Sequence, residues 1–176
     1  MTNLTGSYTI DPVHSNVGFT VRHAMVTKVH GTFNDFESSF TVDGDKVEGT
    51  ATIKTDSIDT ANAQRDGHVK SADFFDVENY PEMTFTITGA EVGDGTEGTV
   101  TGDLTIKGVT KSVSLNVEVL GVKEDQNGDT CLGFEASTKV NRKDFGIDFQ
   151  APLNGGGILV GEKLDIVIEG SAIKNA

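Results

Sequence analysis

The chain has few cations, one cysteine, three prolines and no tryptophan. Its 14 Lys and Arg residues face 27 Asp and Glu residues, so the formal net charge at pH 7 is -13. DNA, RNA and anionic bilayers attract clustered Lys and Arg, so this balance argues against a nucleic-acid partner. Cys131 has no second cysteine to form an internal disulfide with.

Long apolar runs are also missing. No stretch approaches the roughly 20 residues of a membrane-spanning helix, so the sequence predicts no integral membrane segment. The first twenty residues lack the basic start and the apolar segment of a signal peptide, and the chain is therefore expected to be cytoplasmic. Its 176 residues and even composition suit a single domain, residues 1–176.

What the chain does have is apolar and polar residues that alternate with a period of two. Val17, Phe19 and Val21 alternate with smaller or polar neighbours, as antiparallel strands with one buried face do. The alternation predicts eight strands at 15–23, 31–42, 46–56, 82–89, 98–107, 110–122, 130–140 and 163–173, with a short ninth at 8–11. Because an open sheet with an apolar face aggregates, eight strands are expected to close into an all-β antiparallel barrel.

Three local features interrupt the alternation. The apolar parity shifts between Phe33 and Phe36, which predicts a bulge in the second strand. Residues 62–70 have helical spacing, with Thr60 or Asn62 as the cap, and predict a short helix between the third and fourth strands. A second, shorter turn is expected at 141–146.

Small residues stand at several positions of the apolar parity. These are Gly49, Ala51, Gly102 and Ala136. They predict unfilled space on the buried side, which a long apolar ligand would fit.

The sequence offers little for metal binding or catalysis. The four histidines (14, 23, 30 and 68) show no metal-ligand spacing, so no metal and no other cofactor is expected. No GxSxG motif is present, and His14 and Ser15 are neighbours whose side chains point to opposite faces of a strand. The prediction is a protein that is not an enzyme.

A few polar residues stand where a ligand's head would need hydrogen-bond donors. His23 keeps the inward parity at the end of the first strand, and Arg65 and His68 share one face of the predicted helix. Two interpretations remain open. These groups could bind the head of an amphiphile, or Arg65 could pair with Asp66, Asp73 or Asp76 and only tie the connection to the barrel.

Nine short motifs follow one another along the chain, at 11–15 (DPVHS), 19–23 (FTVRH), 31–33 (GTF), 58–60 (IDT), 65–69 (RDGHV), 73–76 (DFFD), 80–81 (YP), 102–110 (GDLTIKGVT) and 142–146 (RKDFG). In this order they resemble the YceI-like family of polyisoprenoid-binding proteins over nearly the whole chain. The resemblance implies a lipocalin-like barrel whose pore holds a long isoprenoid chain, such as a polyprenyl phosphate or a quinone tail, without enzyme activity. Tyr8 departs from the tryptophan that relatives often carry, and the absence of a signal peptide departs from exported relatives.

Together these features predict a carrier or binder of an isoprenoid lipid. The predicted ligand-binding residues are Phe19, Val21, His23, Phe36, Phe40, Ile53, Arg65, His68, Phe85, Ile87, Leu104, Leu115, Val117, Phe134, Arg142 and Ile166. One alternative is an enzyme that acts on a small apolar or isoprenoid substrate in the same cavity. Another is a fully packed barrel that functions through protein contacts, and a homodimer is left open.

Overall fold

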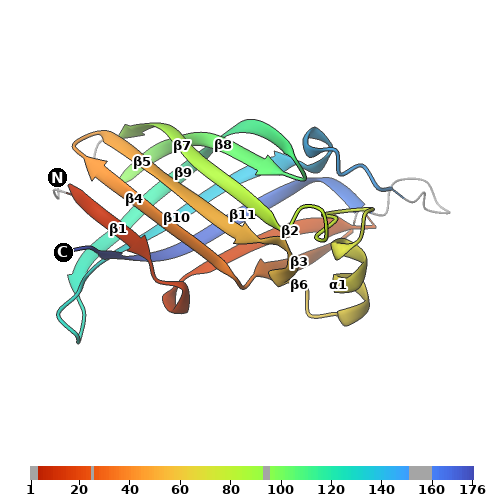
Figure 1. Cartoon of the computed structure of the whole chain (residues 1–176), viewed down its shortest axis with the longest axis horizontal. Helices are drawn as coiled ribbons and strands as arrows, with labels where there is room; N and C mark the ends of the chain where they lie inside the picture. Colours follow the sequence, from red (N-terminus) through yellow and green to blue (C-terminus); the bar gives the residue numbers. More distant parts are fainter. Residues whose placement is uncertain (1–3, 25, 93–95, 151–159) are drawn as a thin grey trace.

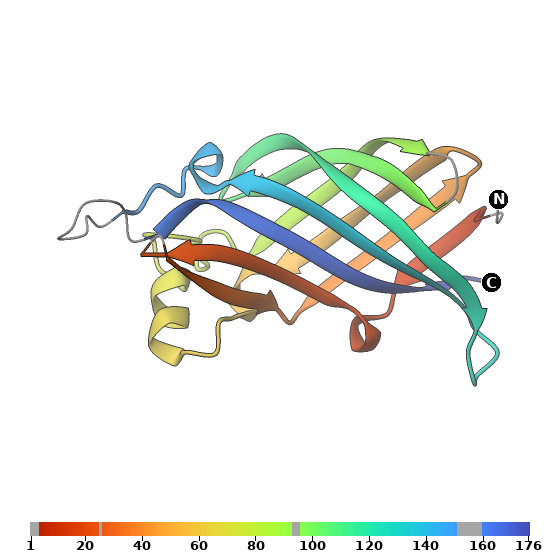
Figure 2. The ribbon, with the colours of Figure 1, turned by 180° about the vertical axis from the view of Figure 1, so that it is seen from behind.

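The computed structural model describes residues 4–24, 26–92, 96–150 and 160–176. Figures 1 and 2 show a long barrel with α1 at one end and both chain termini at the other. The elements are β1 (Gly6–Ile10), η1 (Pro12–His14), β2 (Asn16–His23), β3 (Thr27–Phe33), β4 (Phe36–Asp43), β5 (Lys46–Lys54), η2 (Thr55–Ser57), β6 (Ile58–Asp59), α1 (Ala63–Lys70), β7 (Glu82–Val92), β8 (Glu97–Ile106), β9 (Val109–Glu124), β10 (Thr130–Asn141), η3 (Arg142–Phe145) and β11 (Val160–Lys174).

The sheet is antiparallel and closes on itself. Its order is β1-β4-β5-β7-β8-β9-β10-β11-β2-β3-β6, and a further pairing of β1 with β11 completes the ring. β11 pairs with β1 near the termini and with β2 toward the α1 end, while β4 pairs with β1 and β3 pairs with β2. β1 with β2, and β3 with β4, therefore act as two long interrupted strands, which confirms the predicted eight-stranded barrel.

The interruptions lie where local sequence favours them. Between β1 and β2, Asp11 caps η1 by accepting a hydrogen bond from the Val13 N–H at 3.0 Å. Between β3 and β4, Asn34 and Asp35 leave the strand conformation, so the chain has two strands where a bulge within one continuous strand was predicted at Phe33 to Phe36. The two-residue β6 pairs Ile58 with Phe33 and was not predicted, because two residues are too short to show alternation.

The predicted helix is confirmed as α1, in the connection between β5 and β7. Asn62 is its cap, since its side chain accepts a hydrogen bond from the Arg65 N–H at 2.9 Å. The second predicted turn is η3, which Asn141 caps in the same way and which ends at Gly146 with φ of 74°. Among the helices of the described ranges, none is long and apolar enough to cross a membrane.

The interior divides into two groups of side chains along the barrel axis. The larger group lies toward α1, and its buried members include Val17, Phe33, Leu104, Ile106 and Phe145. The smaller group, called the floor cluster here, lies toward the termini and consists of Tyr8, Ile10, Leu132 and Ala172 with Leu4, Phe36, Phe40, Val42, Val119 and Phe134 packed against them. Phe36 packs against both groups.

Candidate ligand-binding site

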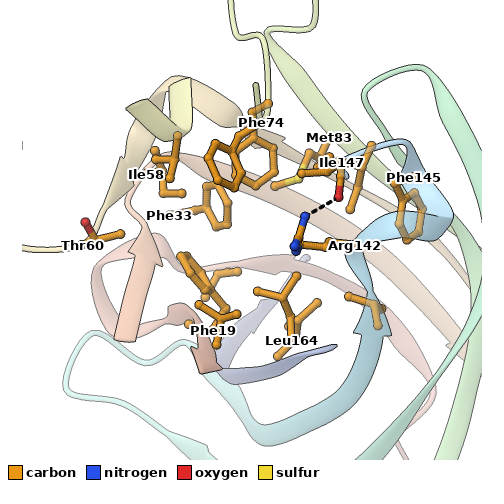
Figure 3. Close-up of a pocket in the computed structure, with 18 of the residues that line it drawn as sticks. Phe19, Phe33, Ile58, Thr60, Phe74, Met83, Arg142, Phe145, Ile147 and Leu164 are labelled. Carbon is orange, nitrogen blue, oxygen red and sulfur yellow. Dashed lines mark hydrogen bonds between the residues drawn. The ribbon is translucent and has the colours of Figure 1, made fainter. Parts of the chain in front are cut away.

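A cavity of about 580 Å³ occupies the α1 half of the barrel. Inward side chains of β2, β5, β7, β8, β9, β10 and β11 form its wall, and α1 and η3 contribute residues at its mouth (Figure 3). The predicted residues that line it are Phe19, Val21, His23, Ile53, Arg65, His68, Phe85, Leu104, Leu115, Arg142 and Ile166. The alternation thus brings residues from most of the chain to one apolar space.

Five other predicted residues lie outside this lining. They are Phe36, Phe40, Ile87, Val117 and Phe134. Phe40 and Phe134 belong to the floor cluster, deeper in the barrel than the cavity, and Phe36 lies between the two groups. Inward parity alone cannot distinguish residues that line the cavity from residues deeper in the barrel. It gives the face of the strand on which a side chain lies, but not its height along the barrel axis.

Several lining residues were not predicted. Phe74, Phe75, Phe145, Ile147 and Phe149 come from the connections that follow α1 and β10 rather than from strands. Phe74 is 8% exposed and Phe145 is 2% exposed, so both belong to the core although they lie outside the sheet. The adjacent Phe74 and Phe75, and the alternation of Phe145, Ile147 and Phe149, are the sequence signals that could have identified them.

The glycines do not leave the empty space that was expected of them. A Cβ placed on Gly102 would lie 2.5 Å from the Phe85 ring, and one on Gly49 would lie 2.5 Å from Phe40 Cβ. Gly102 makes room for the Phe85 ring, and Gly49 makes room for the close approach of β4 at Ser39 and Phe40, so the prediction of unfilled space at these two positions is wrong. Ala136 is 3% exposed and lies outside the cavity, and only Ala51 of the four small residues lines it.

Arg142 is a buried cation in the cavity wall. It is 3% exposed, and it donates to the backbone carbonyls of Gly161 at 2.9 Å, Ile147 at 2.8 Å and Val160 at 3.2 Å. Burial lowers the pKa of the guanidinium below its usual value, and the carboxylates of Glu162 and Asp148 act in the opposite direction. No carboxylate of the described residues forms an ion pair with it, and Figure 3 shows the guanidinium among the apolar side chains.

Arg65 ties α1 to the segment before it. Its Nε donates to Thr60 Oγ1 at 2.9 Å and its Nη2 donates to the Thr60 carbonyl at 2.6 Å. Asp66 accepts from the Thr60 N–H at 2.8 Å, and Thr60 is 4% exposed. Arg65 therefore holds the connection in place through Thr60 rather than through Asp66, Asp73 or Asp76, while its side chain still lines the cavity.

His68 and His23 lie at the mouth. His68 Nε2 lies 3.0 Å from Asp73 Oδ2, and its ring meets the edges of Phe74 and Phe149 with centroids 5.1 and 4.9 Å away. His23 ends β2 as an exposed residue of the lining. Within the described ranges, no group of three or more His, Cys, Asp or Glu residues could hold a metal ion.

Comparisons with known proteins agree on one family. The profile of the YceI-like domain matches residues 8–172. A UPF0312 protein of Photorhabdus laumondii is 43% identical over 155 residues, which cover 85% of this chain and 79% of that protein.

Solved structures show the same fold. The Campylobacter jejuni YCEI protein superposes with a TM-score of 0.74 at 31% identity, over 100% of both chains. A polyisoprenoid binding domain from Saccharophagus degradans, implicated in plant cell wall breakdown, gives a TM-score of 0.71 at 15% identity. That superposition covers 96% of this chain and 98% of the other.

Proposed function

The chain belongs to the YceI-like domain family, and from that premise we propose that its barrel binds one isoprenoid lipid, of the polyprenyl phosphate or isoprenoid quinone type. The observation that carries the proposal is the apolar cavity of about 580 Å³ inside a closed barrel. Ligand pockets of roughly 300–1,000 Å³ bury most of one small ligand. The name of the Saccharophagus degradans domain, a polyisoprenoid binder of the same fold, points to the same ligand class.

Burial of the tail supplies most of the affinity. At roughly 0.8 kcal/mol for each buried CH₂-sized group, one five-carbon unit contributes up to about 4 kcal/mol. Several units would exceed the affinity ceiling of about 18–21 kcal/mol, so ordering and bending of the chain must offset much of the gain. The tail therefore sets the affinity, and the head selects among lipids with similar tails.

We propose that the polar head lies toward the mouth, near Arg142. Three N–H groups of this guanidinium bond backbone carbonyls, which leaves one N–H on each terminal nitrogen. A buried cation without a carboxylate partner favours an anionic or carbonyl oxygen beside it. Both proposed lipid types carry such an oxygen.

The proposed role is to hold or carry the lipid, not to convert it. Turnover of bound lipid that depends on His23 or His68 would instead favour the enzyme. The cytoplasmic location and the homodimer considered above stay predictions, which cell fractionation and sedimentation would test.

Native mass spectrometry of the purified protein tests the proposal most directly. We expect a bound mass that fragments as an isoprenoid, or uptake of an added polyprenyl phosphate by protein stripped of lipid. A protein that carries no small molecule and takes up no polyprenyl lipid would contradict the proposal and favour a packed barrel that acts through protein contacts.

The role of Arg142 is tested by comparing a polyprenyl phosphate with a headless isoprenoid hydrocarbon of the same length. We expect Arg142→Gln to weaken the phosphate by about 1–3 kcal/mol relative to the hydrocarbon, because a charged hydrogen bond is lost. Lys143→Gln is the control, since Lys143 is an exposed neighbour that pairs with Glu162 at 2.9 Å. If Arg142→Gln and Arg142→Lys weaken both ligands equally, Arg142 only supports the backbone it bonds.

A further inference from the structure

The cavity ends at an aromatic layer. Its lining stops at Thr138 on β10 and at Ile168 on β11, where the next inward positions are Ala136 and Gly170. Beyond Ala136 on β10 comes Phe134, which packs in the floor cluster. There the Tyr8 and Phe40 rings stack with centroids 5.2 Å apart, and Phe134 meets Phe40 edge-on at 6.3 Å. Tyr8 is 2% exposed, and the partly buried rings of Phe40 and Phe134 pack against the buried residues of this cluster.

The position of the Phe134 ring depends on one glycine. Phe134 on β10 lies directly opposite Gly170 on β11. A Cβ at Gly170 would lie 2.3 Å from Phe134 Cζ, and its three nearest atoms all belong to that ring. The far end of the Phe134 ring therefore occupies the space that a side chain at Gly170 would fill.

We propose that Phe134, together with Phe40 and Tyr8, is the floor that sets the longest isoprenoid tail the cavity accepts, and that Gly170 fixes the height of this floor. The inference rests on the proposed function, and it names the residues that select tail length. A tail that enters at the α1 end gains affinity with each buried unit until its tip reaches the floor. Further isoprenoid units then stay outside the cavity or force the rings of the floor apart, so the affinity no longer increases with tail length.

Two substitutions should move this limit in opposite directions. Phe134→Leu removes ring volume from the floor and deepens the cavity. Gly170→Ala pushes the ring off the wall into the barrel, and because only the ring must move, the backbone pairing can persist. Gly49→Ala would be a poorer test, since its Cβ would also lie 2.6 Å from the Ser39 carbonyl oxygen.

The experiment measures affinities of polyprenols of increasing length by displacement of a fluorescent polarity probe from lipid-free protein. For the wild type we expect a severalfold gain per unit up to a plateau. Phe134→Leu should move the plateau to longer polyprenols by at least one unit, and Gly170→Ala should move it to shorter ones. Affinities for the shortest polyprenols should change by less than about twofold in Phe134→Leu.

Two control variants distinguish a change in the tail-length limit from a change in affinity at every tail length. Gly133→Ala lies next to Phe134, where the added Cβ has its nearest atom, Leu120 Cβ, at an ordinary 3.8 Å, and it should keep the wild-type plateau. Phe149→Leu shortens an aromatic residue at the mouth and should weaken all lengths alike. Circular dichroism verifies that each variant is folded, and Phe134→Leu decides the outcome if Gly170→Ala does not fold.

The results distinguish this inference from the function on which it rests. If the wild type binds none of the polyprenols, the proposed function fails and the floor fails with it. If the wild type binds with a plateau that folded Phe134→Leu does not move, only the floor is wrong. A wild-type affinity that keeps rising through the longest polyprenols would also overturn the floor.

Discussion

Ala51 and Ala136 are the same residue type at the same strand parity, yet they face different surroundings. Ala51 lines the cavity, whereas Ala136 is 3% exposed and lies outside the lining. We expect Ala51→Phe to fill the cavity, so that polyprenol binding is lost while the lipid-free protein keeps its melting temperature. We expect Ala136→Phe to overpack the wall and to lower the free energy of unfolding by about 1–3 kcal/mol.

Thermal melts and polyprenol competition on the two variants check this prediction. An equal loss of melting temperature in both lipid-free variants would show that the space in front of Ala51 is packed. The sequence could not separate the two alanines. Their surroundings depend on which side chains from other strands lie at the same height along the barrel axis. Alternation gives only the face of the strand, not that height.

The same limit explains the glycines. Gly31 and Gly102 stand in the sequence as gaps in the apolar pattern, but their missing side chains make room for the rings of Phe19 and Phe85. Each ring belongs to the neighbouring strand, so the pairing depends on register, and sequence spacing alone does not give register. The shape of the cavity is therefore set by where the aromatic rings lie and not by where the glycines lie.

At the scale of elements, α1 is held mainly by polar contacts. No residue of α1 is buried, and Arg65 bonds both the hydroxyl and the carbonyl of Thr60. We expect Arg65→Ala to lower the melting temperature of the lipid-free protein, and to weaken phosphate-headed and headless isoprenoids by the same factor. Melting curves and paired binding measurements check both effects.

Arg65→Lys is the informative companion variant. It keeps the positive charge but loses the planar guanidinium that reaches both Thr60 oxygens. If the role of Arg65 is to hold α1 to Thr60, Arg65→Lys should therefore behave like Arg65→Ala. If Lys instead preserves binding of the headed lipid, and Ala weakens that lipid alone with no change in melting temperature, then Arg65 contacts the head.

Elements with strong local signals could be predicted from the sequence. The strands, the capped helix at Asn62 and the turn at Asn141 each depend on residues within a few positions. The parts that could not be predicted depend on long-range contacts. The bonds from Arg142 to the Gly161 and Val160 carbonyls and the pairing of β6 with β3 are such contacts, and each joins segments that are far apart in the sequence.

At the scale of the whole molecule, the barrel has a polar mouth and a closed interior. The Arg and His candidates line the cavity in the α1 half, and the floor cluster lies toward the end at which Figures 1 and 2 show both termini. On the proposed function, a lipid enters and leaves on the α1 side, so we expect this end to approach the membrane or the partner that supplies the lipid.

The net charge of -13 opposes approach to anionic membranes. We expect lipid-free protein to take up a fluorescent polyprenol slowly from anionic vesicles at low salt, and faster as salt shortens the Debye length from about 30 Å at 0.01 M to about 10 Å at 0.1 M. Uptake from zwitterionic vesicles should depend little on salt, because there is no surface charge to screen. Stopped-flow fluorescence with both vesicle types measures the rates. Faster uptake from anionic than from zwitterionic vesicles at low salt would contradict the prediction, because cations at the mouth would then outweigh the charge of the whole protein.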